Sequence, residues 1–341
     1  MAERTGIEWT GATWNPVVGC TKVSPGCKNC YMYREQERYG QDPRVVRRTS
    51  PHTFNMPLSP RRVPPGTMVF VCSWSDLFHE AVDPHRPEIW AIMRRRSDVI
   101  FQVLTKRPER IPDHLPDDWG EGYDNVWLGT SVEDQDRVTR VADLLRVPAR
   151  VRWLSMEPLL GEVDLDLVPL DTRDPLNPFG CPGHLQPLRR RFVGALGDPV
   201  MDARNSCDVS EGIDWVVVGG ESGPHARPTH PRWLRLVRDQ CRDVGVPVLM
   251  KQWGEWAPKS TAPQVRITSA EDFGVLDPGG EWYAGHTGWN GREEDPNTGE
   301  ASMRRVGKRA AGRLLDGELL DGYPDVPGWR RDPVTGLWGR A

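Results

Sequence analysis

The sequence has no long hydrophobic run. No apolar stretch reaches membrane-spanning length, and Met1 is not followed by the apolar segment of a secretory signal. We therefore expect a cytoplasmic protein that does not bind a membrane. Hydrophobic residues make up 38% of the 341 residues, an ordinary globular share that excludes wholesale disorder.

The sequence also has little net charge and few lysines. Its 44 basic and 48 acidic residues give a net charge of -4, which excludes a polycation that coats nucleic acid non-specifically. Only six of the basic residues are lysines; two flank a group of cysteines, and Lys106 and Lys251 each end an apolar segment. Because an ammonium group binds carboxylates and phosphates differently from a guanidinium fork, Lys106 and Lys251 are candidate site residues.

The seven cysteines are unevenly distributed. Their odd number argues against a disulfide-stapled secreted protein, and clustered thiols in a reducing compartment more often bind metal than form cross-links. Cys20, Cys27 and Cys30 fall within eleven residues. The other four are scattered and need no special role: Cys72, Cys181, Cys207 and Cys241.

Short apolar runs alternate with helix-like segments from residue 66 onward. Such alternation predicts βαβ units and a parallel sheet. We therefore predict an α/β fold, a partial or complete (β/α) TIM-type barrel of about six to seven parallel strands. The expected strands are 13–18, 68–72, 100–104, 126–129, 151–154, 215–218 and 246–250, and the expected helices are 31–39, 87–96, 133–145 and 232–244.

Two stretches break this alternation. Residues 162–212 are rich in Pro and Gly and are expected to form an insertion within a barrel domain of residues 1–254. Residues 255–341 are expected to form a small C-terminal β-rich appendage, with a turn at Trp289-Asn290-Gly291 and a short helix over 308–315.

Polar residues follow nearly every predicted strand. In (β/α) barrels the chemistry lies at the carboxyl ends of the strands, so these residues are the candidates for a site. Three of them also have a purely structural interpretation. Ser131 is alternatively a helix cap, Glu133 a charge at the start of a helix, and Trp253 a core residue. The candidates are Ser73, Ser75, Lys106, Ser131, Glu133, Glu157, Glu221, Lys251 and Trp253.

The cysteine group follows the first strand. Cys27 and Cys30 form a C-x2-C pair, and Pro25-Gly26 turns the chain so that Cys20 joins them. Three thiolates without an evident fourth ligand favour a [4Fe-4S] cluster with one open iron, or a zinc ion completed elsewhere. Cys72 is the candidate fourth ligand for zinc, and thiols without a metal role are the remaining alternative.

The sequence carries a set of distinctive motifs in eight segments: 7–10, 14–16, 19–31, 104–108, 129–133, 155–159, 219–223 and 312–317. Together these motifs resemble a phage- and prophage-associated family of radical-SAM-like proteins of unknown substrate. Among characterised enzymes the chain is distantly similar to spore photoproduct lyase. Its C-x6-C-x2-C spacing departs from the common radical SAM motif, C-x3-C-x2-C.

This resemblance implies an iron–sulfur, S-adenosyl-L-methionine (SAM)-dependent radical enzyme that abstracts a hydrogen atom as a lyase, isomerase or transferase. Cys20, Cys27 and Cys30 would hold the [4Fe-4S] cluster. SAM would contact Lys106 through its carboxylate, with Ser73, Ser75, Ser131, Glu133 and Glu221 as further cofactor contacts. Glu157, Lys251 and Trp253 would face the substrate.

The resemblance also bears on partners. It implies a nucleotide or nucleic-acid base as substrate, in repair or modification, an electron donor such as flavodoxin or ferredoxin, and the host cytoplasm if the protein is phage-encoded. Two other functions stay open. One is a zinc-binding barrel enzyme acting on nucleic acid by base exchange or hydrolysis, and the other is a non-catalytic phage interaction protein.

Overall fold

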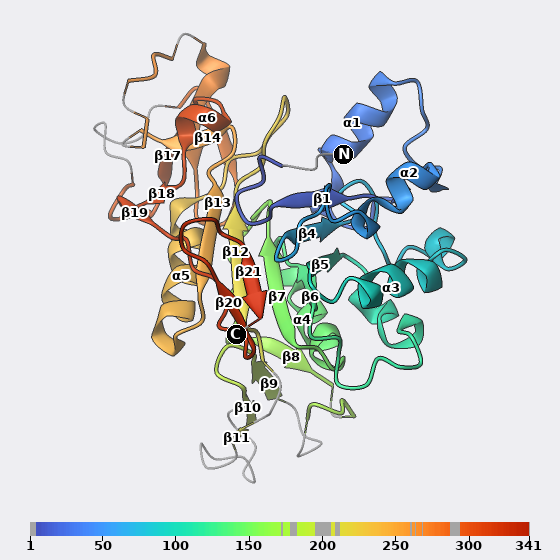
Figure 1. Cartoon of the computed structure of the whole chain (residues 1–341). Coiled ribbons are helices and arrows are strands. Elements are labelled where there is room, and N and C mark those ends of the chain that lie inside the picture. The colour runs from blue at the N-terminus through green and yellow to red at the C-terminus, as the bar shows by residue number, and fades with distance from the viewer. Residues whose placement is uncertain are drawn as a thin grey trace.

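The computed structural model describes most of the chain (Figure 1). The described residues are 5–171, 173–177, 183–194, 206–208, 212–259, 261–262, 264–267, 269–286 and 294–340. The expected turn at Trp289-Asn290-Gly291 and Cys181 lie outside them, as does the side chain of Cys207. No helix in these residues is long and apolar enough to cross a membrane.

A seven-stranded parallel sheet curves into a half-barrel, which confirms the predicted fold class. Its strand order is β1-β4-β5-β6-β7-β12-β13, so each crossover connects neighbouring strands. The strands are β1 (Ala12–Trp14), β4 (Met68–Val71), β5 (Ile100–Thr105), β6 (Val126–Ser131), β7 (Val151–Met156), β12 (Trp215–Gly219) and β13 (Val248–Gln252).

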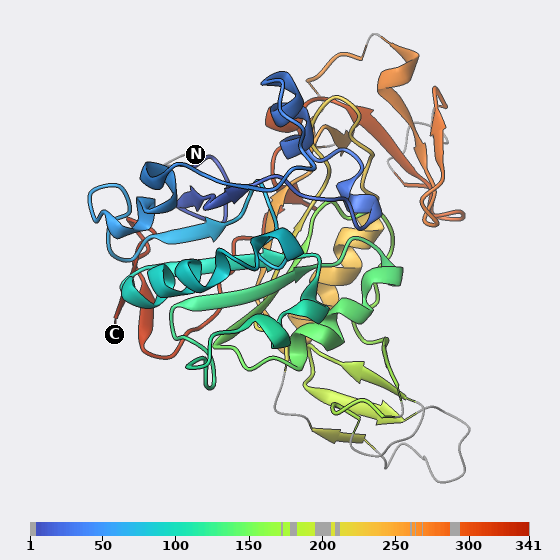
Figure 2. The same ribbon diagram turned by 90° about the vertical axis from the view of Figure 1, so that its right-hand side faces the viewer.

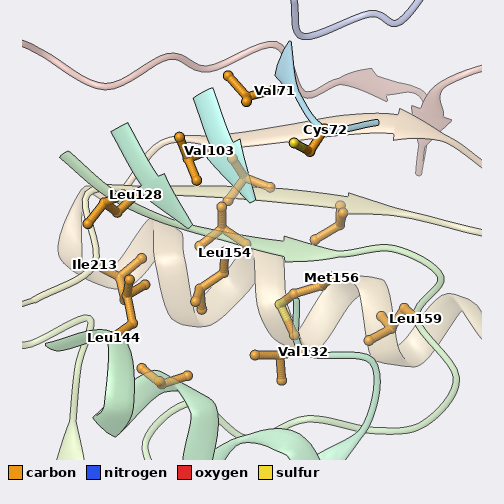
Figure 3. Packing of buried hydrophobic residues seen from close by; sticks show 14 of the residues in the cluster. Val71, Cys72, Val103, Leu128, Val132, Leu144, Leu154, Met156, Leu159 and Ile213 are labelled. Atoms are coloured by element: carbon orange, nitrogen blue, oxygen red, sulfur yellow. The ribbon is translucent and has the colours of Figure 1, made fainter. Parts of the chain in front are cut away.

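Helices pack against the convex face of this sheet. Residues such as Val103, Leu128 and Leu154 alternate along the strands and meet apolar residues of the helices, including Leu144 (Figure 3). These helices are α3 (Arg86–Arg95), α4 (Thr139–Leu145) and α5 (Pro231–Val244). The chain also forms the short helices α1 (Tyr31–Arg38), α2 (Pro51–Phe54) and α6 (Lys308–Ala311).

Three expected elements are shorter than predicted. The strand expected over 13–18 divides into β1 and β2 (Val17–Val18), and β2 pairs with β3 (Arg47–Arg48) instead of the main sheet. The helix expected from residue 133 begins at Thr139, after a 3-10 turn at Gln135–Arg137. The helix expected over 308–315 is wrong beyond Ala311, because Gly312 has a φ of +68° and ends it.

The concave face of the sheet is lined by tryptophans. Trp127, Trp153 and Trp215 alternate with the outward residues of β6, β7 and β12, and Trp9 packs onto them. Gly129 makes this layer possible, because a Cβ atom there would overlap the Trp153 indole. The lower interior of the half-barrel is therefore filled by side chains.

Two small antiparallel sheets lie at opposite ends of the molecule (Figure 2). The insertion forms one, with strands β8 (Val168–Leu170), β9 (Gly183–Gln186), β10 (Arg191–Gly194) and β11 (Ser206–Asp208). The β-rich C-terminal part forms the other, with β14 (Trp256–Pro258), β15 (Phe273–Leu276), β16 (Trp282–Ala284) and β17 (Ala301–Arg305).

The last described residues return to the half-barrel. The hairpin of β18 (Leu314–Leu315) and β19 (Glu318–Leu319) leads to a segment whose Leu320 carbonyl accepts from Met250 N in β13, at 2.9 Å. The hairpin of β20 (Trp329–Arg331) and β21 (Trp338–Arg340) then packs Trp329 and Trp338 into the concave tryptophan layer (Figure 1). The chain end thus completes the barrel core.

Candidate functional site

The cysteine loop, residues 19–30, lies at the carboxyl edge of the half-barrel. It leaves β2, makes a 3-10 turn at Pro25–Cys27 and runs into α1. Gly19 N donates to the Trp74 carbonyl at 2.9 Å, and Ser75 Oγ donates to the Gly19 carbonyl at 2.7 Å. Because Trp74 and Ser75 directly follow β4, these bonds fix the start of the loop to the strand ends.

Glu133 anchors the middle of the cysteine loop. Its side chain is fully buried; it accepts from Ser24 Oγ at 2.7 Å and pairs with Lys106 Nζ at 3.0 Å and Arg140 at 2.9 Å. Burial opposes its charge, but the two cations hold the pKa of Glu133 below its usual value. Gly26 packs directly on this carboxylate, where a Cβ atom would overlap Oε1.

Glu221 anchors the far end of the loop. It accepts from Asn29 Nδ2 at 2.9 Å and pairs with Arg227 at 2.6 Å, and Arg227 also donates to the Pro25 carbonyl at 3.1 Å. Burial would raise the pKa of Glu221, but its bonds with Arg227 and Asn29 hold it below the usual value. Both glutamates therefore hold the loop.

Arg107 connects the first cysteine to a buried carboxylate. Its guanidinium donates to Cys20 Sγ at 3.7 Å and pairs with Asp76 at 3.2 Å. Asp76 also accepts from Thr105 Oγ1 at 2.7 Å. Burial and the nearby Asp76 raise the pKa of Cys20 to about 12, and they outweigh the lowering effect of Arg107.

Tyr33 of α1 contacts the cysteine loop. Its hydroxyl donates to the Cys20 carbonyl at 2.7 Å. Burial raises the pKa of Tyr33, and the nearby Cys20, Cys30 and Cys27 raise it further. Among the described residues, no group of three His, Cys, Asp or Glu side chains is arranged around a single metal-ion position.

A second cluster of polar side chains lies at the carboxyl ends of β7 and β13. Lys251 Nζ contacts both carboxylate oxygens of Glu157, at 2.8 and 2.7 Å, and Gln252 Nε2 donates to the same carboxylate at 3.1 Å and to Ser222 Oγ at 2.7 Å. The hydroxyl of Tyr31 is near this group, since burial, the Cys30 thiolate and Glu157 all raise its pKa. The carboxyl ends of β7 and β13 thus carry a largely buried ion pair.

Two buried polar atoms at this edge lack a hydrogen-bond partner in the described part of the chain: Ser131 Oγ and Gln252 Oε1. Ser131 lies on the concave face, two residues beyond Gly129 and toward the strand end. Because an unpaired buried hydroxyl is costly, these atoms mark a place where a bound polar group would gain hydrogen bonds.

Three of the other predicted site residues have protein partners. Ser73 Oγ bonds with Asn15, at 2.9 Å from Nδ2, and the Ser73 carbonyl accepts from the Tyr31 hydroxyl. Ser75, as described, holds Gly19. Trp253 is 2% exposed and donates to the Leu314 carbonyl at 2.8 Å, so its ring is part of the core.

The scattered cysteines that the structure describes lie in the core. Cys72 is buried at the end of β4 with a φ of +60°, beside Val71 in the convex-face cluster (Figure 3). Cys241 is fully buried in α5. Burial raises the pKa of both thiols, as expected for packing residues.

Sequence reasoning missed five residues that hold the loop. Asp76 and Arg107 sit one position beyond predicted residues, so reading each strand end one residue further would have found them. Tyr33, Arg140 and Arg227 have no such signal, because they lie on helices or in a distant loop. Their roles depend on tertiary packing.

Comparison with known proteins places the chain in a family. No curated protein and no solved structure matches it. One family model, described as a protein of unknown function (DUF5131), matches residues 4–324. The chain therefore belongs to the DUF5131 family.

Proposed function

We propose that this protein is an iron–sulfur, SAM-dependent radical enzyme that abstracts a hydrogen atom from its substrate. The observation that carries the proposal is the position of the cysteine loop, which is held by Glu133 and Glu221 over the carboxyl ends of a parallel half-barrel. Catalytic groups of (β/α) barrels lie at this edge.

The residues of the loop offer ligands for a [4Fe-4S] cluster. Cys20, Cys27 and Cys30 would be its ligands, because one loop at the strand ends presents three thiols, the number that a cluster with one open iron takes. When bound with SAM, the cluster supplies a radical able to abstract hydrogen, while the protein supplies binding, orientation and electrostatics.

Two cations next to the sulfurs support this assignment. Arg107 donates to Cys20 Sγ, and the pKa of Lys106 is raised by Glu133 and Cys27 although burial opposes its charge. Positive groups near cysteine thiolates stabilise the anionic sulfur and the charge of a cluster. Lys106 and Arg107 would thus tune the redox centre.

The buried polar atoms without a hydrogen-bond partner support a SAM site beside the loop. Ser131 Oγ and Gln252 Oε1 are buried without partners and offer hydrogen bonds to a polar cofactor. Ser73, Ser75, Glu133 and Glu221 already hold the protein together, so we now assign them to positioning of the loop. Lys106 keeps its proposed contact with the SAM carboxylate while paired with Glu133.

We extend the proposal to a nucleotide or nucleic-acid base as substrate. Glu157 and Lys251 offer an acceptor and a donor at the carboxyl ends of β7 and β13. The ring of Tyr31 is 42% exposed next to Cys30 and provides a surface on which a base stacks. These residues would orient the substrate near the cluster.

Cluster assembly tests the proposal. After anaerobic reconstitution we expect about four iron and four sulfide per chain, since three thiolates hold one cubane. Cys27→Ala should lose the cluster, whereas Cys241→Ala, which removes a core thiol, should keep it. A colourless protein that binds one zinc instead would contradict the proposal and favour the zinc enzyme.

A further inference from the structure

A surface groove lies on the outer side of the cysteine loop. It measures about 530 Å³ and is lined by Lys22, Tyr33, Glu37, Asp42 and Arg44, among others. Lys22 Nζ lies 4.5 Å from the centre of the Tyr33 ring, so a cation covers the aromatic face inside the groove.

Exposed apolar side chains are frequent in the chain segment that lines this groove. In the described part of the chain ten large hydrophobic side chains are exposed, and four of them fall within residues 23–45. They are Tyr31, assigned above to the substrate side, and Val23, Tyr39 and Val45, exposed by 44%, 65% and 54%. Apolar groups clustered on a charged surface mark interaction sites, whereas single ones need no explanation.

The charge of this segment is opposite to that of the whole chain. Residues 20–48 contain seven basic and three acidic residues, in a chain whose net charge is -4. Lys22, Lys28, Arg34, Arg38 and Arg44 are all exposed. The surface therefore complements an acidic partner, and such complementarity steers association.

Tyr33 joins the groove to the cysteines. It lines the groove, and its hydroxyl donates to the Cys20 carbonyl at 2.7 Å. Tyr33 thus links the groove directly to the first cysteine of the loop.

From these observations we propose that the groove over Tyr33, with the surrounding surface of residues 20–48, docks a small acidic electron-carrier protein. This inference rests on the proposed function, because it supplies the electron that the cluster requires. One electron passes from the reduced flavin or iron–sulfur centre of the carrier to the cluster. The carrier is oxidised by one electron, the cluster is reduced by one, and no atom is transferred.

A protein fits this surface better than a nucleic acid. Asp42 pairs with Arg44 at 3.0 Å, Glu35 lies next to Arg34 at 3.7 Å, and Glu37 lines the groove. These carboxylates interrupt the positive charge and would repel a continuous phosphate backbone, whereas a protein surface of mixed charge accommodates them. The exposed Val23 and Val45 suit apolar contacts with a protein.

The test measures binding and reduction separately. Oxidised flavodoxin and a plant-type ferredoxin, both acidic, are titrated against the anaerobically reconstituted full chain at low and high salt. The variant Lys22→Glu/Arg44→Glu is compared with Arg61→Glu/Arg330→Glu, which reverses two exposed charges outside residues 20–48. Circular dichroism checks that both variants fold. Cluster reduction is then followed by absorbance, with the reduced carrier or with dithionite.

We expect wild type to bind at least one carrier with an affinity that falls as salt rises. The groove variant should bind that carrier about tenfold more weakly and be reduced by it more slowly, with unchanged reduction by dithionite. The control should resemble wild type. Equal binding and reduction of the groove variant and wild type would overturn the inference, as would binding of single-stranded DNA, but neither carrier, through these charges.

Failure of the proposed function is read separately, from the absence of iron and sulfide after reconstitution. The binding measurement does not depend on the cluster.

Discussion

Gly26 and Glu133 are in such close contact that a Cβ atom on Gly26 would overlap the Glu133 carboxylate. The contact joins the turn of the cysteine loop to the residue that follows β6, and Ser24, Lys106 and Arg140 bind the same carboxylate. The loop is therefore placed by residues that contribute no sulfur.

Gly26→Ala should displace the loop and lower the iron content after reconstitution severalfold, because backbone and carboxylate cannot both keep their positions. Iron and sulfide analysis measures the effect. Gly339→Ala is the matched control, since nothing lies within 4 Å of the atom it adds. Wild-type iron content in Gly26→Ala would show that the contact does not place the loop.

Glu133→Gln should lower the free energy of unfolding by about 3 kcal/mol at pH 7, because it leaves the charges of Lys106 and Arg140 without their buried partner. Urea denaturation measures this difference. A loss below about 0.5 kcal/mol, the size found for exposed ion pairs, would contradict this account.

The contribution of Glu133 should also depend on pH. Its folded-state pKa is lower than the unfolded value of about 4.3, so the stabilisation is complete above that value and disappears as the pH falls through the folded-state pKa. The difference in stability between wild type and Glu133→Gln should therefore be constant from pH 6 to 7 and shrink below about pH 4. A stability difference between the two proteins that grows as the pH falls would contradict this prediction.

Cys20 should react slowly with iodoacetamide in the metal-free protein. With a pKa of about 12, only roughly one thiol in ten thousand is ionised at pH 8. Asp76→Asn removes a charge that raises this pKa, so Cys20 should be alkylated faster in that variant. Peptide mass spectrometry at pH 8 gives the rates, and a slower reaction in Asp76→Asn would contradict the prediction.

Trp338→Ala should cost about 3–5 kcal/mol of stability. Trp338 is 4% exposed, packs edge-on against Trp127 with ring centroids 5.4 Å apart and donates to Met68 Sδ at 3.0 Å. Val334→Ala is the control in the same hairpin, because Val334 is 91% exposed. Equal stability of the two variants would show that the hairpin is not part of the barrel core.

Much of the fold was predictable because parallel strands buried on both faces leave continuous apolar runs. The runs ending at Cys72, Leu104 and Leu154 are examples, and residues after the first two, Ser75 and Lys106, do lie near the cysteine loop. The packing of Trp338 into the half-barrel could not be predicted in this way. The short hairpin buries single tryptophans, and these give no continuous apolar run and no periodic pattern in the sequence.

The roles of the polar residues were less predictable than their positions. Glu133 and Glu221 were expected to contact a cofactor, yet both bind the cysteine loop. A sequence shows that a carboxylate follows a strand, but its partners, such as Arg140 on α4 and Arg227 in a distant loop, are set by packing across the sheet.

The most direct test of the central claim is SAM cleavage by the reconstituted, dithionite-reduced protein. We predict that it forms 5'-deoxyadenosine, quantified by liquid chromatography and mass spectrometry, and that Cys27→Ala forms none. Wild-type protein that contains the cluster and forms no more 5'-deoxyadenosine than Cys27→Ala would contradict the account.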